Sequence, residues 1–250
     1  MLNSLCMSSS IILMYHDVVN DLCPKSGRQI EGALQYTISD MTFEAHVKQT
    51  IKDDIVYTFD DGGCSFISPT ADILERYNKK AIYFIATSYL NTPFFLTKEE
   101  VKELDNRGHI IASHSHTHPE KISSLTREEC LKEWKVSKSI LEDIVGHSVS
   151  AASIPGGDIS DMVIDCMVDA GYTEIYTSEP TTVVKKYKGV HIIGRYGITQ
   201  SMSSQKFFTL IHNQHFRNKL LLKYKILTFA KIVLGDNYNK MKQFALRLRR

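Results

Sequence analysis

The sequence of 250 residues lacks the features that would place it in an oxidising compartment or across a membrane. No stretch approaches the roughly 20 apolar residues that a membrane-spanning helix requires. The first residues show no basic segment followed by a long apolar core, which is the pattern of a secretion signal. The five cysteines are scattered and include no CxxC pair, so a disulfide framework is not expected. We therefore expect a soluble, cytoplasmic protein.

Charge is distributed unevenly along the chain. Residues 215–250 contain ten Lys or Arg and a single acid, whereas the other 214 residues contain 20 basic and 27 acidic side chains. A basic segment of this kind is typical of an interaction surface. As a cationic amphipathic helix it would suit peripheral contact with an anionic membrane, and packing on the rest of the protein is the alternative. Nucleic-acid binding is not expected, because only this segment favours it.

Short apolar runs alternate with amphipathic segments, which predicts alternating strands and helices. The runs are mostly β-branched, as buried parallel strands tend to be. Seven strands are predicted: Ile11–Tyr15, Ile55–Phe59, Ala81–Ala86, His109–Ala112, Val149–Ile154, Glu174–Thr177 and Val190–Ile193. We expect an α/β fold, a distorted (β/α) barrel of about seven strands in residues 1–200, followed by a basic helical extension in residues 201–250. An open doubly wound sheet is the alternative.

Helices are expected between these strands. Capping boxes that begin at Thr97 and Thr126 predict two helix starts, and Gly108 and Gly146 lie where such helices would end. Further helices are predicted near Phe43–Lys52, Pro69–Asn78 and Ile159–Ala170. Residues 17–35 contain one proline and two glycines and are interpreted as a long loop that could cover a site as a lid.

Two adjacent carboxylates follow the strand predicted at Ile55–Phe59. Asp60 and Asp61 precede two glycines at the carboxyl end of this strand, which is where α/β folds place their sites. Two like charges this close resist joint ionisation unless a cation or a proton separates their roles. A turn with two solvated aspartates is the simpler alternative for this motif alone.

Three histidines follow the strand predicted at His109–Ala112, namely His114, His116 and His118. Alternate residues of an extended chain share one face, and residues four apart share one face of a helical turn. Either geometry can place two imidazoles on one metal ion. One aspartate oxygen and two histidine nitrogens leave the fourth zinc position open for water, as in catalytic sites. With the nearby aspartates, the histidines predict a metal centre.

The motifs Thr58-Phe59-Asp60-Asp61-Gly62 and His114-Ser115-His116-Thr117-His118 together resemble the polysaccharide deacetylase (NodB-homology) family of carbohydrate esterases. The resemblance covers about residues 11–198. It implies that Asp60 is the catalytic base and that Asp61, His114 and His118 bind a divalent metal, while His116 has no such role. A mixed nitrogen and oxygen ligand set suits zinc, with cobalt or nickel as alternatives.

The family's third motif carries an arginine, two residues before a proline, that orients the catalytic aspartate. Here Ser153 occupies that position before Pro155. Relatives with a Pro-Gly-Gly form of the motif carry an arginine later, after a short strand, and Arg195 is the corresponding residue. An arginine there would lower the pKa of Asp60 and fix its rotamer. A surface arginine is the alternative.

The family's usual general acid, a histidine in a C-terminal Leu-x-His motif, has no good counterpart. Leu210-Ile211-His212 imitates the motif but lies in a segment with helical spacing. Tyr15-His16 resembles the N-terminal element of circularly permuted members, which deacetylate poly-N-acetylglucosamine. We therefore expect His16, once protonated, to deliver a proton to the departing amine.

The sequence thus predicts a metal-dependent hydrolase that removes the acetyl group from an N-acetylated amino sugar. The resemblance places the substrate beside Pro155, Gly156 and Gly157, where a backbone N–H could hold the oxyanion. An inactive carbohydrate-binding relative is one alternative, since the third-motif arginine is missing. A metallohydrolase acting on another amide is a second alternative. The retained Asp60 counts against the first, because a binding protein gains nothing from a positioned base.

Overall fold

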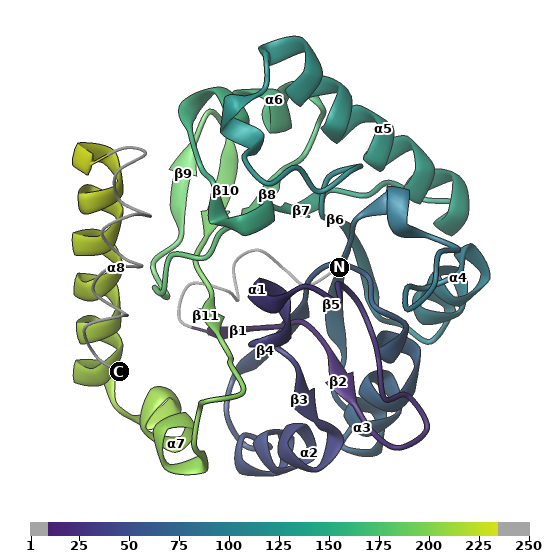
Figure 1. Ribbon diagram of the computed structural model, residues 1–250, viewed down its shortest axis with the longest axis vertical. Coiled ribbons are helices and arrows are strands. Elements are labelled where there is room, and N and C mark those ends of the chain that lie inside the picture. Colours follow the sequence, from purple (N-terminus) through teal and green to yellow (C-terminus); the bar gives the residue numbers. More distant parts are fainter. Residues whose placement is uncertain (1–9, 235–250) are drawn as a thin grey trace.

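The computed structural model describes residues 10–234, which form a single nine-stranded sheet with helices packed against it (Figure 1). The strand order is β11-β1-β4-β5-β6-β7-β8-β10-β9, and a two-stranded sheet pairs β2 with β3. The strands are β1 Ile11–Tyr15, β2 Val18–Val19, β3 Ile38–Ser39, β4 Ile55–Phe59, β5 Ala81–Ile85, β6 Ile110–Ser113, β7 Ala151–Ser153, β8 Glu174–Tyr176, β9 Lys185–Tyr187, β10 Val190–Ile193 and β11 Tyr196–Gly197.

The large sheet is a curled half-barrel of parallel strands in which only the β9–β10 pair is antiparallel. Its two edge strands, β11 and β9, do not pair with each other within the described residues. The predicted α/β barrel class is confirmed, and all seven predicted strands are present. The expected strand number was too low, because β9 and β11 were not predicted.

Eight α-helices are assigned within residues 10–234. They are α1 Glu31–Leu34, α2 Asp40–Gln49, α3 Asp72–Arg76, α4 Lys98–Asn106, α5 Arg127–Val145, α6 Asp161–Asp169, α7 Ser204–His212 and α8 Gln214–Leu234. Both predicted capping boxes are present: Thr97 caps α4 and Thr126 caps α5 by accepting a backbone N–H while a glutamate side chain bonds back to the cap residue. Gly146 ends α5 in the left-handed conformation, with φ 81°.

The alternation of side chains along each strand divides the core between the two faces of the sheet. Ile11, Leu13 and Tyr15 of β1 point to the helix-covered face, where they join a large cluster that includes Phe43 of α2. Ile12 of the same strand points to the other face and joins a smaller apolar cluster. Both faces are apolar, as expected of a buried, mostly parallel sheet, and because these strands run parallel their carboxyl ends meet at one edge.

The segment after β1 is more structured than a plain loop. Residues 17–35 include β2 and the four-residue helix α1, and β2 pairs in parallel with β3. Ile38 N donates to the carbonyl oxygen of Asp17 at 3.0 Å, which extends this pairing. Most of the segment is a long loop, as expected, but it contains these two short elements and is joined to β3 by this pairing.

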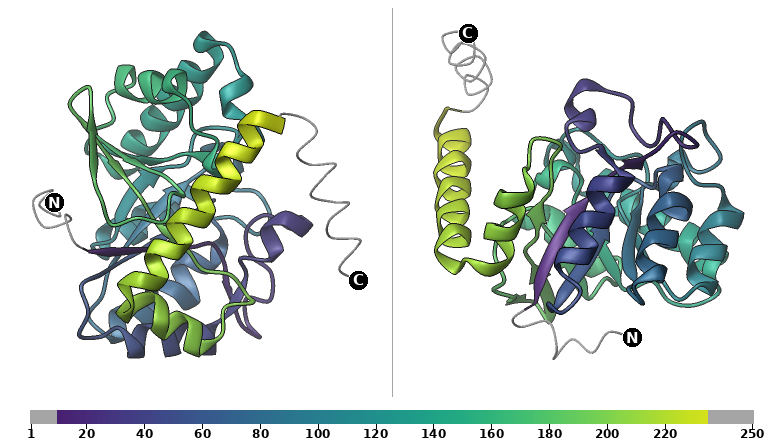
Figure 2. Two further views of the ribbon diagram at one scale, coloured as in Figure 1. Left: turned by 90° about the vertical axis from the view of Figure 1, so that its left-hand side faces the viewer. Right: turned by 90° about the horizontal axis from the view of Figure 1, so that it is seen from below.

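Two helices follow the last strand. Phe207 of α7 is buried and stacks on His46 of α2 with ring centroids 3.8 Å apart, which anchors α7 to the barrel. Helix α8 stands along the side on which β9, β10 and β11 lie (Figure 2). None of the described helices is long and apolar enough to cross a bilayer. The division of the chain at residue 200 and the cytoplasmic location stay predictions.

Candidate metal centre and active site

The sequence-predicted site residues meet at the carboxyl edge of the large sheet. Asp60 and Asp61 follow β4, His114 follows β6, and His16 follows β1. These strands are parallel and lie within four consecutive positions of the sheet, so their carboxyl ends are brought together (Figure 1). The structure thereby gathers residues that are up to 102 positions apart in the sequence, between His16 and His118.

Asp61, His114 and His118 form a compact, buried cluster of metal-ligand type. One ligand atom from each lies within 4.8 Å of the others. The Oδ1 atom of Asp61 lies 3.4 Å from His114 Nε2 and 3.3 Å from His118 Nε2, yet it is buried without a hydrogen-bond partner. Burial by itself would raise the pKa of Asp61, but the two imidazoles outweigh it and hold that pKa well below its usual range.

The surroundings of His114 orient it as a ligand. Its Nδ1 atom lies 3.0 Å from the carbonyl oxygen of Ser153 and 2.6 Å from the Ser153 hydroxyl. A proton on Nδ1, donated to that carbonyl, leaves the lone pair of Nε2 facing Asp61. The orphaned Asp61 oxygen and two such nitrogens fit a zinc-type ion, and three protein ligands leave a position free for water and substrate.

The backbone that carries the cluster adopts sparsely populated conformations. Asp61, Ser115 and His118 have positive φ values of 84°, 64° and 53°, although none is a glycine. Ser115 accepts a hydrogen bond from His118 N at 3.1 Å, which holds the second histidine in its turn. Strained residues of this kind concentrate at functional sites because the surrounding structure must over-determine them.

Asp60, adjacent to Asp61, has a different partner. Arg195 donates from Nη1 to Oδ1 of Asp60 at 2.6 Å and from Nη2 to Oδ2 at 2.8 Å, a bidentate ion pair. Arg195 is fully buried and also donates to Thr58 Oγ1 and to the carbonyl oxygen of Thr177. Burial would raise the pKa of Asp60, but Arg195 and His114 hold it below its usual range. Arg195 is therefore not the surface residue of the alternative interpretation.

His16 lies at the same edge, stacked on Tyr36 with ring centroids 4.4 Å apart. Its Nδ1 atom is buried without a hydrogen-bond partner. Burial lowers the pKa of His16. The negative charges of Asp61 and Asp60 act in the opposite direction and partly offset this shift. His212, by contrast, lies 3.9 Å from Asp53, which precedes β4 at the opposite edge of the sheet.

The remaining predicted residues flank this cluster. Pro155, Gly156 and Gly157 form a tight turn two residues after β7, next to Ser153. The N–H of Gly157 donates to the carbonyl oxygen of Ile154 at 3.2 Å, which leaves the Gly156 N–H as the donor that oxyanion binding by this turn would require. His116 lies outside the ligand cluster and hydrogen-bonds to Thr87 at 2.9 Å between Nδ1 and Oγ1.

Arg28, in the segment after β1, is a site residue that the sequence did not indicate. Its Nη1 atom lies 3.0 Å from His118 Nδ1 and 3.3 Å from His118 Nε2, across 90 positions of sequence. The segment was expected to cover a site, but nothing in its composition distinguishes this arginine from other surface arginines. Only the folded path of the chain brings it to the metal-ligand cluster.

The same segment is held against the loop that follows Asp61. The carboxylate of Asp17 fits between Gly27 and Gly63, where a Cβ atom would lie only 2.3 and 2.2 Å from its oxygens. Burial raises the pKa of Asp17 to about 7. The Sγ atoms of Cys23 and Cys64 lie 3.6 Å apart between these two loops, as free thiols. Residues 17–35 are thus closely packed on the loop that carries Asp61.

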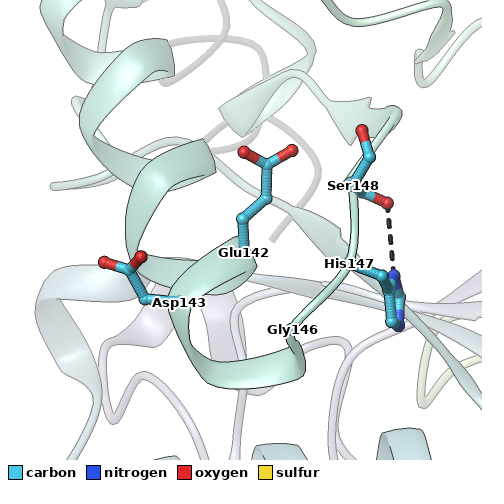
Figure 3. A pocket seen from close by; sticks show the side chains of 5 residues that line it. All are labelled: Glu142, Asp143, Gly146, His147 and Ser148. Carbon is cyan, nitrogen blue, oxygen red and sulfur yellow. Dashed lines mark hydrogen bonds between the residues drawn. The ribbon is translucent and has the colours of Figure 1, made fainter.

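A hollow on the surface lies away from this chemistry (Figure 3). Glu142 and Asp143 on the last turn of α5 line it with His147 beyond Gly146. It lies before the start of β7, and therefore at the amino edge of the sheet, opposite the site. His147 Nε2 lies 2.8 Å from Asp105 Oδ1 of α4, so this histidine holds the turn between α5 and β7 against α4.

The sequence is similar to those of known proteins. The family model described as "Polysaccharide deacetylase" matches residues 47–175. Chitin deacetylase 1 of Cryptococcus neoformans is 26% identical over 207 residues, covering 80% of this chain and 42% of that protein. The peptidoglycan-N-acetylglucosamine deacetylase PgdA of Listeria monocytogenes is 32% identical over 112 residues, covering 44% of this chain and 23% of that protein. The chain spans about half or less of the length of the curated relatives it matches.

A solved structure shares the fold. The deacetylase PplD of Streptococcus pyogenes, in complex with acetate, superposes with a TM-score of 0.69 and 19% identity. The match covers 82% of this chain and 98% of that one. At this identity the similarity concerns the fold, and it supports the curled sheet described above.

Proposed function

Because the chain belongs to the polysaccharide deacetylase (NodB-homology) family, we propose that it hydrolyses the N-acetyl group of an N-acetylated amino sugar. One observation carries the proposal: a buried Asp-His-His cluster lies beside an aspartate held by a buried arginine. The first group suits a metal ion and the second suits a general base. Together they supply the two functions that hydrolysis of an unactivated amide needs.

Asp61, His114 and His118 would hold the metal, zinc in the first instance and cobalt or nickel as alternatives. Such an ion, when bound, polarises the acetamide carbonyl and makes water a stronger nucleophile at neutral pH. The protein's own contribution is a fixed ligand geometry, because Ser153 orients His114 and Ser115 holds His118. Pro155, Gly156 and Gly157 would line the sugar on the Ser153 side of the site.

Asp60 would accept the proton of the attacking water. The bidentate bond to Arg195 fixes its rotamer and keeps it ionised at neutral pH, which a base requires. Two adjacent aspartates could both remain charged, because Asp60 is paired with Arg195 and a bound metal ion would be the cationic partner of Asp61. Arg195 would take the role of the arginine that is missing from the position of Ser153, because it holds Asp60 by a bidentate bond. This replacement argues against an inactive carbohydrate-binding relative.

His16 would return a proton to the nitrogen of the departing amine. An amine leaves poorly unless it is protonated, so the reaction needs an acid at this edge of the site. The stacking of His16 on Tyr36 fixes the plane of the ring. Its approach from β1, the first strand in sequence, is what the circularly permuted relatives would require.

The proposal is tested by acetate release from N-acetylglucosamine, its oligomers and N-acetylated peptidoglycan strands, after removal of metal and again after addition of Zn²⁺. We expect release from at least one amino sugar only with metal. The Asp60→Asn protein should keep its metal and lose roughly 10²–10⁴-fold in turnover, because an amide cannot accept the proton.

The His114→Ala protein is the matched variant for the ligand cluster, and elemental analysis should show that its metal is lost. Full metal retention by His114→Ala would contradict the ligand assignment. Equal loss of metal and turnover in Asp60→Asn would make Asp60 a ligand. Release of acetate or formate only from amides that are not sugars would move the activity to another amide substrate.

A further inference from the structure

Helix α8 carries a row of exposed apolar side chains on the face that points away from the barrel. Leu222, Ile226, Phe229 and Val233 are 60%, 59%, 68% and 63% exposed. Their spacing of four, three and four residues places them within an arc of roughly 60° on a helix of 3.6 residues per turn. We call these four residues the apolar row of α8. Four large apolar side chains in line on a surface helix are uncommon without a partner.

The apolar row is not the face by which α8 is attached. Phe216 and Leu220 pack against the main core, and they lie on the opposite side of the helix. Arg217 on that side donates to the carbonyl oxygens of Leu210 and Ile211, at 2.8 and 2.6 Å, where α7 ends. Tyr224 is half-buried one turn further along. The helix therefore has two apolar faces, and within residues 10–234 only one of them is packed.

Lysines border the apolar row on both sides. Lys219 and Lys223 lie on one flank and Lys225 on the other, and all three are exposed. Helix α8 contains no acidic residue, and within residues 10–234 these lysines have no carboxylate partner. An apolar centre with a cationic border fits a surface that is itself apolar beneath an anionic layer.

We propose that the apolar row of α8 and its flanking lysines bind the surface of an anionic lipid bilayer. The helix would lie in the plane of the interface, with Phe229 and its neighbours in the acyl boundary and the lysines at the phosphates. The charge distribution of the chain supports this orientation. Residues 1–214 contain 27 acids against 20 bases, so only the basic end of the protein would be attracted to such a surface.

Two other occupants of this face are disfavoured by charge. A second copy of the chain would bring lysines against lysines across the row, with no acid in α8 to pair them. The sequence beyond residue 234 contains five basic residues and one acid, so it too has the sign of the lysines. Neither a second copy of α8 nor residues 235–250 supplies the negative charge that would complement the lysines beside the apolar row.

The test is sedimentation of the full chain with vesicles of phosphatidylcholine alone and of phosphatidylcholine mixed with phosphatidylserine. We expect binding to the anionic vesicles, weakened by added salt, and little binding to phosphatidylcholine alone. The double variant Ile226→Ser, Phe229→Ser should bind at least tenfold more weakly. The triple variant Lys219→Glu, Lys223→Glu, Lys225→Glu should lose both the binding and its salt dependence.

Val183→Ser is the matched control, because Val183 is 63% exposed and belongs to the segment between β8 and β9, not to α8. It should bind vesicles as the unchanged chain does. All variants should release acetate from a soluble substrate at the original rate if they are folded, so lipid binding is read separately from the proposed chemistry. Unchanged vesicle binding by the double variant would overturn the proposal. A dimer that Phe229→Ser converts to monomer, without vesicle binding, would assign the face to a second copy instead.

Discussion

The carboxyl edge of the sheet buries charged side chains, whereas the outer face of α8 exposes apolar ones, and both arrangements are unusual in a folded protein. At the edge, charged groups such as Asp60, Asp61 and Arg195 are buried, although charged residues are seldom fully buried without a partner. On α8, large apolar residues such as Phe229 are exposed in line. In the first region the polar groups bind to one another, whereas in the second the apolar groups have no partner among the described residues, 10–234.

The difference shows where each region obtains its stability. At the edge, most polar atoms are satisfied internally; His16 Nδ1 and the Asp61 Oδ1 atom are not, and the latter lies where a metal would bind. Residues of this region should therefore affect both stability and chemistry. Residues of the outer face of α8 should affect neither, and should matter only for binding. The predictions that follow, from the largest expected effect to the smallest, test this division.

The largest effect is expected for His16. His16→Ala should slow hydrolysis of sugar amides by roughly 10²–10⁴-fold, because the departing amine then lacks its proton donor. An activated aryl acetate should be affected far less, since its phenolate leaves without a proton. Steady-state rates on the two substrates measure the difference. His212→Ala is the matched control at the opposite edge and should leave both rates near the original; a reversed pattern would return the acid to the C-terminal half.

The next effect concerns Arg195 and the stability of the edge. Arg195→Leu leaves the Asp60 carboxylate buried and unpaired, which should cost about 3–5 kcal/mol in the free energy of unfolding at neutral pH. Arg195 lowers the folded-state pKa of Asp60, so its contribution is present above the unfolded-state pKa and is lost as the pH falls through the folded-state pKa. The deficit of the variant should therefore shrink in acid.

Urea unfolding at several pH values measures this deficit. Arg195→Lys keeps the charge but loses the bidentate geometry, and it should lie between the two proteins. If the free energy of unfolding of Arg195→Leu fell by less than about 1 kcal/mol, the loss would be no larger than for an exposed ion pair. The stability of the fold would then not depend on the Asp60–Arg195 pair.

A smaller effect is expected for His46, which joins the barrel to α7. Burial lowers the pKa of His46 to about 4, below its usual range. A lowered folded-state pKa means that stability is fully present above the unfolded value of about 6.5 and is lost as the pH falls toward about 4. We expect a loss on the order of 2 kcal/mol, measured by urea unfolding at pH values across this range. The free energy of unfolding of His46→Gln should depend less steeply on pH over this range. An identical dependence would show that His46 is not the group whose protonation destabilises the fold.

The smallest effect is expected on the outer face of α8. Ile226→Ser and Phe229→Ser should each change the free energy of unfolding by less than about 0.5 kcal/mol, because both side chains are exposed. Leu220→Ala, on the packed face, should cost about 1 kcal/mol or more. Thermal unfolding compares the three. A similar loss in all of them would show that the outer face is part of the fold and would remove the contrast with the edge.

The strands were predictable because their pattern is local. Ile11–Tyr15 and Ile55–Phe59 are apolar runs with clear borders, and the structure has β1 and β4 with these bounds. Strand β9, Lys185–Tyr187, was missed because an edge strand with exposed lysines carries no apolar pattern. Strand β11 has only two residues and exists because β1 offers a free edge for pairing.

At the site, the sequence could indicate residues that belong to a motif. It could not indicate residues that reach the site only through contacts between distant parts of the sequence. Asp61 and His114 belong to motifs directly after strands, and the structure brings them together; their roles stay predictions. Arg195 was predicted from resemblance, and its bidentate bond to Asp60 depends on tertiary structure. Arg28 was missed because a contact across 90 residues leaves no trace in local pattern.

The topology of the sheet sets an order of assembly for a chain that is synthesised from its N-terminus. Strand β1 must pair with β4 on one side and with β11 on the other, where Leu13 lies opposite Tyr196. Asp61, His114 and His118 have all been made once His118 is added, but Arg195 follows roughly 4–15 s later at about 5–20 residues per second. Closing so long a loop is slow and costly in chain entropy. A nascent chain therefore contains Asp61, His114 and His118 before Arg195 is available to pair with Asp60. The Asp60–Arg195 pair and the pairing of β1 with β11 are completed at nearly the same time.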